Sequence, residues 1–232
     1  MATPPERLRR QSSGEQVALH IRKLIFEGEL RPGMRVPQDK VARSLGISRI
    51  PVREALIALE GEGWVTNELH RGAFINSLDE PAVRDHYELF GIIYGFAARK
   101  ATQRQGAPLA TQLRPLLRAI NGEDEPRSFS QLTIDFHSRV VDAAQSPRTK
   151  VMLRSMAGMI PGDFFELVPG AIATQRRGAA SIVAAIGRGE ADQAGERYTR
   201  LMNRQGELVV GVLRDRGLLD RSALVPSGDA GV

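Results

Sequence analysis

The sequence predicts a mainly α-helical protein: an N-terminal winged helix-turn-helix of three helices plus a β-hairpin, followed by an all-α bundle of about six helices. Three observations predict this fold class. Apolar residues recur at helical spacing through most of the chain. Strand-like runs occur only at 64–66 and 73–75. Glycines and prolines divide the part after residue 79 into helix-length segments.

Three N-terminal helices are expected from apolar periodicity and from the turns between them. Gly28 ends the first, and the second spans 38–45 and ends at Gly46. The third begins at Ser48, whose hydroxyl is suited to cap a first turn, and Pro51 lies where a missing N–H costs little. A helix, a short turn and a second helix form the arrangement that places a helix in the DNA major groove.

The two short strands at 64–66 and 73–75 are predicted to form a hairpin around a polar turn at 67–72. A hairpin in this place is the wing of a winged helix-turn-helix. The tip residues suited to enter a DNA minor groove are His70, Arg71 and Gly72. An ordinary solvated hairpin tip is the alternative.

Two arginines, Arg49 and Arg53, lie one turn apart at the start of the third helix. Guanidinium groups match the acceptors of guanine and of phosphate, so these side chains are candidate DNA readers. The alternative is that they are surface arginines paired with Glu54 or Glu60.

Composition sets the broad class. The net charge is +5, and residues 1–76 hold 12 basic against 9 acidic residues, which favours a polyanionic partner. Cysteine is absent, which excludes disulfides and fits the cytoplasm. No run approaches the ~18 apolar residues of a membrane span. The absence of a nucleophile–base arrangement and of a phosphate-binding glycine loop argues against an enzyme.

The expected domains are a winged helix-turn-helix at 13–76, a linker at 77–81 and an all-α effector and dimerisation domain at 82–216. Flexible tails are expected at 1–12, which is basic, and at 217–232. Helices of the second domain are expected at about 79–103, 107–121, 126–145, 148–160, 170–188 and 190–216. The stretch 162–169 is a candidate lid or dimer contact.

The motifs at 28–33, 45–56 and 59–65 resemble those of the GntR family of bacterial transcription regulators. The resemblance covers about residues 13–216. It is to the FadR-like branch with a helical FCD effector domain, and the helix count resembles the six-helix VanR subgroup. It implies a homodimer on a palindromic operator that Ser48 and both arginines contact. Ile50, where relatives often carry threonine, is then suited to a thymine methyl.

Many relatives hold a divalent metal through one aspartate and three histidines of the effector domain. By resemblance, the corresponding positions here are Thr133, His137, Ala179 and Leu201. One ligand of four remains, and a lone imidazole does not hold zinc or nickel tightly. We therefore expect no metal and no cofactor.

The resemblance also places Phe90 where relatives often carry a pocket arginine, and Tyr94 where glutamate is common. The expected effector pocket is lined by Phe90, Tyr94, Thr133, His137, Ala179 and Leu201. Such a lining favours an apolar effector, an acyl chain or an aromatic compound, that releases a repressor from DNA. The alternatives are a cavity filled by side chains, a metal-plus-carboxylate sensor of the usual kind, and an effector-free architectural DNA-binding protein.

Overall fold

The computed structural model describes residues 13–156 and 164–219. They belong to two compact units that meet in sequence between Leu78 and Asp79. The predicted tail 1–12, residues 220–232 of the predicted C-terminal tail, and residues 162–163 of the candidate lid lie outside the described residues. The predicted fold class is confirmed: an N-terminal helix-turn-helix with a two-stranded hairpin, followed by a helical bundle.

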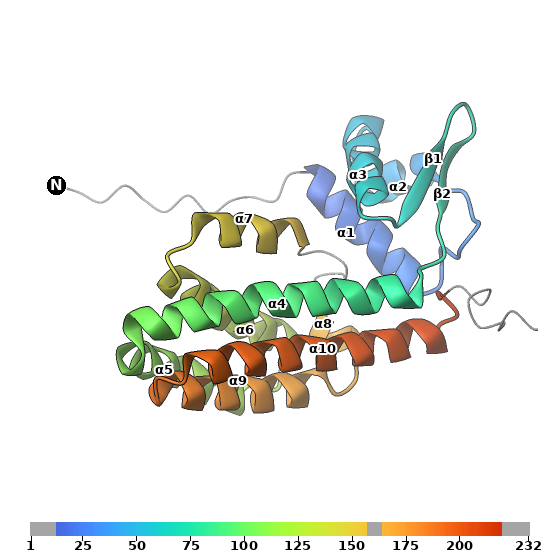
Figure 1. Ribbon diagram of the computed structural model, residues 1–232. Coiled ribbons are helices and arrows are strands. Elements are labelled where there is room, and N and C mark those ends of the chain that lie inside the picture. Colours follow the sequence, from blue (N-terminus) through green and yellow to red (C-terminus); the bar gives the residue numbers. More distant parts are fainter. Residues whose placement is uncertain (1–12, 157–163, 220–232) are drawn as a thin grey trace, which may run out of the picture. The chain divides into compact units, whose positions relative to one another are not determined.

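Three helices and a hairpin build the first unit (Figure 1). Their bounds are α1 Ser13–Phe26, α2 Gln38–Leu45, α3 Arg49–Gly61, β1 Val65–Glu68 and β2 Gly72–Ile75. The strands pair antiparallel, with Val65 opposite Ile75 and Glu68 opposite Gly72. Both strands run further than the sequence predicts, so the turn is 69–71 rather than 67–72. Pairing supplies the extra strand length, because Asn67 and Glu68 have little strand propensity of their own.

Apolar faces of α1, α3 and the hairpin enclose the core of this unit. Its buried residues include Val17, Ile21, Ile25, Phe26, Val52, Leu56, Leu59, Trp64, Val65 and Ile75. Arg22 of α1 donates to the carboxylate of Glu62, just after α3, and so ties the two helices together at the edge of the core. These contacts hold α3 by one face and leave its opposite face outside the core.

The turn between α2 and α3 sets the direction in which α3 leaves. Gly46 has a φ of 65°, and its N–H donates to the carbonyl of Arg43 at 3.2 Å. The N–H of Ile47 donates to the carbonyl of Ala42 at 3.0 Å, which completes a Schellman motif. Ser48 then occupies the N-cap position of α3, but its side chain makes no capping bond to the described helix. The predicted capping role of this hydroxyl is therefore wrong.

Helices alone form the named elements of the second unit (Figure 1). They are α4 Glu80–Gln105, α5 Ala107–Gly122, α6 Pro126–Ala143, α7 Pro147–Met156, α8 Phe164–Leu167, α9 Ala171–Gly187 and α10 Ala191–Asp215. Six correspond to the six predicted helices, and residues 157–160 of the predicted helix 148–160 lie outside the described residues. The single turn α8 is additional and lies within the candidate lid 162–169.

Two predicted boundaries are wrong by a few residues. Helix α4 begins at Glu80, so the last part of the predicted linker 77–81 is helical, with Pro81 in its first turn. Leu218 is buried, and its N–H donates to the carbonyl of Leu213 at 2.9 Å. The predicted tail 217–232 therefore begins with residues that pack against α10, because an apolar side chain after Gly217 can fold back on the helix.

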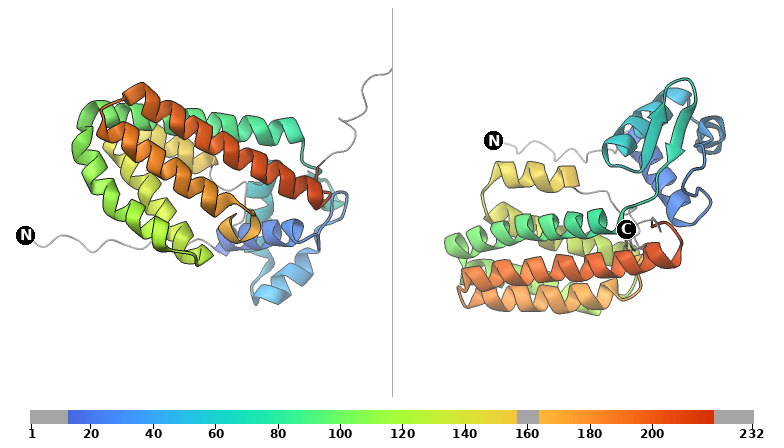
Figure 2. Two further views of the ribbon diagram at one scale, coloured as in Figure 1. Left: turned by 90° about the horizontal axis from the view of Figure 1, so that it is seen from below. Right: turned by 45° about the vertical axis from the view of Figure 1, so that its right-hand side comes forward.

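Helices α4 and α10 lie side by side along most of their length (Figure 2). Glycines allow the close approach: a Cβ at Gly95 would lie 2.8 Å from the carbonyl oxygen of Gly195. A Cβ at Gly206 would lie 2.6 Å from the Cβ of Tyr87. Helix α9 packs on α10, and α5 packs on α6 and α9, so that one apolar core fills the bundle.

Gly206→Ala is expected to lower the free energy of unfolding by about 1–2 kcal/mol, because the new methyl overlaps Tyr87 in a close-packed interface. Gly211 of the same helix is the matched control, since its Cβ position has nothing within 4 Å. Gly211→Ala is expected to stabilise by about 0.5–1 kcal/mol through helix propensity. Urea denaturation followed by circular dichroism measures both. Stabilisation by both substitutions would contradict the close packing of α4 on α10.

Candidate nucleic-acid interface and effector site

Helix α3, the predicted DNA-reading helix, presents one face to the core and one to solvent. Val52, Leu56 and Leu59 are buried, whereas Ile50 is 68% and Ile57 is 69% exposed. Ile50, Arg53 and Ile57 follow one another at spacings of three and four residues, so they share the outer face. Ile57 was missed in the sequence reading, although its spacing from Ile50 indicates the same face.

The two candidate reading arginines differ in their surroundings. The Nε of Arg49 lies 2.5 Å from Oδ1 of Asp39 in α2, and both side chains are largely exposed. Arg53 is exposed and has no ion pair or hydrogen bond with any residue in the described part of the chain. Neither arginine pairs with Glu60, whose carboxylate accepts two hydrogen bonds from Asn67 at 2.8 Å. These bonds lower the pKa of Glu60.

At the wing tip, His70 has a φ of 61° and Gly72 a φ of 102°. The positive φ favours glycine at position 72, and a Cβ there would also displace the Arg35 guanidinium, whose Nε would lie 2.8 Å away. Arg71 pairs with Glu68, and its guanidinium carbon lies 5.3 Å from the ring centroid of Phe74. Exposed pairs of this kind are weak, so a phosphate can replace Glu68 as the partner of Arg71.

A hydrogen-bonded chain crosses the second unit through His137 of α6. Its Nδ1 lies 2.7 Å from the hydroxyl oxygen of Tyr198, and its Nε2 lies 3.3 Å from Nε2 of Gln175. Gln205 donates from its Nε2 to Oε1 of Gln175 at 2.8 Å. Because the Gln175 amide nitrogen can only donate, we assign Nε2 of His137 as the acceptor and Nδ1 as the protonated nitrogen.

Aromatic rings surround this chain. Tyr94 stacks on Tyr198 at 5.2 Å between centroids, lies 5.0 Å from the His137 ring, and contacts Phe90 at 4.8 Å. Although part of the histidine residue reaches solvent, burial of its ring lowers the pKa of His137 to about 4. Burial raises the pKa of Tyr94 to about 12 and that of Tyr198 well above its ordinary value. All three groups are therefore uncharged at neutral pH.

The structure brings Phe90, Tyr94 and His137 of the predicted pocket into ring contact. Ala179 and Leu201 are buried in the same core. Thr133 is 5% exposed, and its Oγ1 has no hydrogen-bond partner among the described residues.

The sequence reading missed the buried polar residues Tyr198, Gln175 and Gln205. Helical spacing could have found them. Gln175 lies four residues before Ala179, and Tyr198 and Gln205 lie three before and four after Leu201. The expected apolar lining is therefore accompanied by neutral hydrogen-bonding groups.

The residues of this site do not fit the divalent metal of the usual family pattern. Both ring nitrogens of His137 already face side-chain partners, and Thr133, Ala179 and Leu201 supply no imidazole or carboxylate. Across residues 13–156 and 164–219, no three or more of the histidine, aspartate and glutamate side chains group as metal ligands would.

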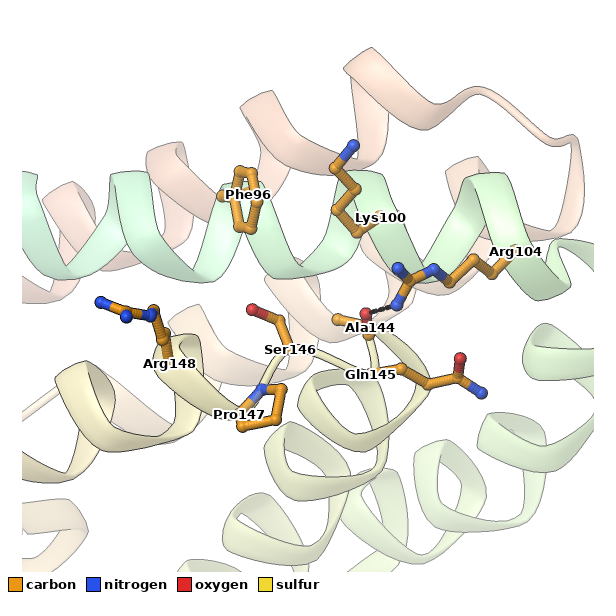
Figure 3. A pocket seen from close by; sticks show the side chains of 8 residues that line it. All are labelled: Phe96, Lys100, Arg104, Ala144, Gln145, Ser146, Pro147 and Arg148. Carbon is orange, nitrogen blue, oxygen red and sulfur yellow. Dashed lines mark hydrogen bonds between the residues drawn. The ribbon is translucent and has the colours of Figure 1, made fainter.

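A separate hollow of about 460 Å³ lies between α4 and the turn that joins α6 to α7 (Figure 3). Arg104 of α4 donates to the carbonyl oxygen of Ala144 across it. None of its lining residues belongs to the predicted pocket. They are Phe96, Lys100, Arg104, Ala144, Gln145, Ser146, Pro147 and Arg148.

In neither unit does a described helix have the length and hydropathy to cross a membrane.

Two family models match the chain. The model described as bacterial regulatory proteins, gntR family, matches residues 13–75, and the FCD domain model matches residues 85–204. The chain belongs to the gntR family. Both parts of the resemblance inferred from the motifs, the helix-turn-helix and the FCD domain, are thus confirmed.

Known relatives of this gntR-family chain are transcription regulators. An uncharacterised HTH-type transcriptional regulator of Mycobacterium tuberculosis (strain H37Rv) is 34% identical over 151 residues, which are 65% of this chain and 62% of that protein. The gluconate operon transcriptional repressor of Bacillus subtilis is 28% identical over 144 residues, 60% of this chain and 58% of the repressor. Each match thus spans less than two thirds of the relative. The family consists of regulators, and the prediction that the chain is not an enzyme is confirmed.

Among solved structures, E. coli McbR/YncC is similar with a TM-score of 0.60 and 15% identity. The match covers 89% of this chain and 99% of the E. coli chain. At this identity the similarity concerns the fold, and it agrees with the two-part architecture described above.

Proposed function

We propose that this gntR-family chain is a sequence-specific DNA-binding repressor that works in the bacterial cytoplasm and leaves its operator when an apolar effector binds. The outer face of α3 carries the proposal. On this face Arg53 lies between two exposed isoleucines, Ile50 and Ile57. Arg53 has no ion-pair or hydrogen-bond partner among the described residues. Guanidinium groups read guanine, and apolar side chains contact thymine methyls. The Bacillus subtilis relative that acts as a repressor supports the direction of regulation.

The proposed regulator is a homodimer that binds a palindromic operator. An apolar stripe on α4 supports dimerisation: Leu89, Ile92 and Phe96 are 54%, 51% and 42% exposed and share one helix face. Exposed apolar stripes of this kind mark protein interfaces. A twofold dimer would present two copies of α3 to successive major grooves. Sedimentation velocity of the full chain measures the dimer directly.

The effector proposed here is apolar and uncharged, and it can carry one hydrogen-bonding group. The rings of Tyr94 and Phe90 make this part of the site apolar, and the neutral His137 offers no positive charge to a carboxylate. The Thr133 hydroxyl is buried and has no partner among residues 13–156 and 164–219, which costs free energy that a ligand hydroxyl or carbonyl would recover. Family-type metal binding is not part of this proposal, because the ligand set is missing.

Ligand binding to wild-type protein and to Thr133→Val tests this site. A neutral phenol or medium-chain alcohol is expected to raise the melting temperature without added metal and to release bound DNA. Thr133→Val should leave the stability of the ligand-free protein unchanged or higher, since no hydrogen bond is lost. It should weaken binding of the alcohol by about 1 kcal/mol but leave the matching alkane unaffected.

Two outcomes would contradict the proposal. Binding of a carboxylate that depends on added Zn²⁺ or Ni²⁺ would indicate the metal-plus-carboxylate sensor. DNA footprints without sequence preference, unchanged by every probe, would indicate an effector-free architectural protein.

A further inference from the structure

The ion pair between Asp39 and Arg49 joins the two helices of the helix-turn-helix. Asp39 is in the first turn of α2, and Arg49 is the first residue of α3. The Schellman turn at Gly46 brings them together, so that Oδ1 of Asp39 lies 2.5 Å from Nε of Arg49. Both side chains remain accessible, with 50% of Asp39 and 64% of Arg49 exposed.

The contact engages one particular edge of the guanidinium. The guanidinium of arginine is a rigid plane with five N–H groups, and Asp39 makes its ion pair at the Nε edge of that plane. The terminal Nη1 and Nη2 groups are left for another partner. A guanine presents O6 and N7 side by side in the major groove, and two terminal guanidinium nitrogens bind them as a pair. The Asp39 contact therefore holds Arg49 in an orientation suited to end-on reading of a guanine.

The negative charge of Asp39 is unexpected on a surface proposed to bind DNA. A carboxylate there repels phosphates and lowers affinity for any DNA sequence. As an exposed ion pair it contributes little to folding stability. A gain in specificity accounts for it, because Arg49 bound to a carboxylate is less able to bind phosphates at random and is held ready for a base.

We propose that Asp39 is a positioning residue that sets the specificity of Arg49 for a guanine. This inference rests on the proposed function, in which α3 binds operator DNA. Asp39 acts through Arg49 and needs no DNA contact of its own.

The test uses the full chain and a duplex selected by the wild-type protein from a random-sequence pool. Every base pair of the duplex is then changed singly, and affinities are measured for wild type, Arg49→Ala, Asp39→Ala and Asp39→Asn. The base pair that Arg49 reads is the one at which Arg49→Ala no longer discriminates between bases. Glu27→Ala is the charge-matched control, since Glu27 lies in the same unit and pairs with Lys23.

Asp39→Ala is expected to reduce discrimination at the Arg49 base pair by roughly tenfold and to leave the other positions unchanged. The affinity of Asp39→Ala for unrelated DNA should be higher than that of the wild type. Its plot of log binding constant against log salt concentration should be steeper by about one per binding site. Asp39→Asn should retain part of the discrimination, since its amide oxygen keeps a polar contact at the Nε edge of Arg49 but lacks the negative charge. Glu27→Ala should leave the base preferences as in wild type.

The inference would be overturned if Asp39→Ala discriminates between bases at the Arg49 base pair as well as the wild type does. It would also be overturned if Asp39→Ala loses discrimination equally at every base pair. In both cases the proposed function would stand, because a duplex had been selected. A pool from which no duplex is selected would instead refute the proposed function itself.

Discussion

Arg53→Ala is expected to weaken operator binding by about 1–3 kcal/mol for each recognition helix, and by about twice that for a dimer with both helices bound. Arg53 is exposed on the outer face of α3 and has no partner in the described part of the chain that competes with DNA. The loss should concentrate at one base pair of each half-site, since a paired guanidinium contact distinguishes guanine from the other bases. Fluorescence anisotropy on single-base variants of the operator measures it.

Arg118→Ala is the control for Arg53→Ala, because it removes the same charge from the exposed side of α5 in the other unit. Its operator affinity should remain near that of wild type. Equal affinities of Arg53→Ala and wild type would refute the reading role of Arg53. A uniform loss over all sequences would instead show that Arg53 binds phosphate.

Acidification from pH 7 to about pH 4 is expected to destabilise the second unit by about 1–3 kcal/mol through His137 alone. Burial lowers the pKa of His137 to about 4 in the folded state, whereas an unfolded histidine titrates near 6.5. Between these values the unfolded chain binds the proton first. The stabilisation is therefore complete above pH 6.5 and is lost as the pH falls toward 4.

His137→Gln isolates this effect, because a glutamine keeps hydrogen-bonding groups near Tyr198 and Gln175 but does not titrate. The difference in unfolding free energy between wild type and His137→Gln should shrink as the pH falls through this window. Burial also lowers the pKa of His86, and that contribution cancels in the comparison. A difference that stays constant from pH 7 to pH 4 would show that His137 is well hydrated.

Much of this fold follows from short-range features of the sequence. Apolar spacing predicts α1 to α3 and the six longer helices of the second unit, because one helix face must be buried. Gly46 and Pro51 mark the turn and the start of α3 through backbone preferences that need no partner. The side of α3 that carries Arg53 follows from the same periodicity, as the buried Val52 and Leu56 require.

Contacts between helices could not be predicted in this way. The sequence did not predict Asp39 as the partner of Arg49. It predicted that Ser48 caps α3, but the Ser48 hydroxyl makes no capping bond. Spacing within a helix shows which way a side chain points, but it does not show what the neighbouring helix presents to it. The correct partner depends on the angle and distance at which two helices pack.

By itself, the sequence determined the two-part architecture, the family and the recognition helix, because motifs and periodicity are local properties of the chain. The tertiary structure alone decided which side chains contact one another at the sites. His137 of α6 meets Tyr198 of α10 across 61 positions of sequence and Gln175 of α9 across 38. Buried polar groups find partners wherever packing brings donors and acceptors within hydrogen-bonding distance, and only the packed bundle defines those distances.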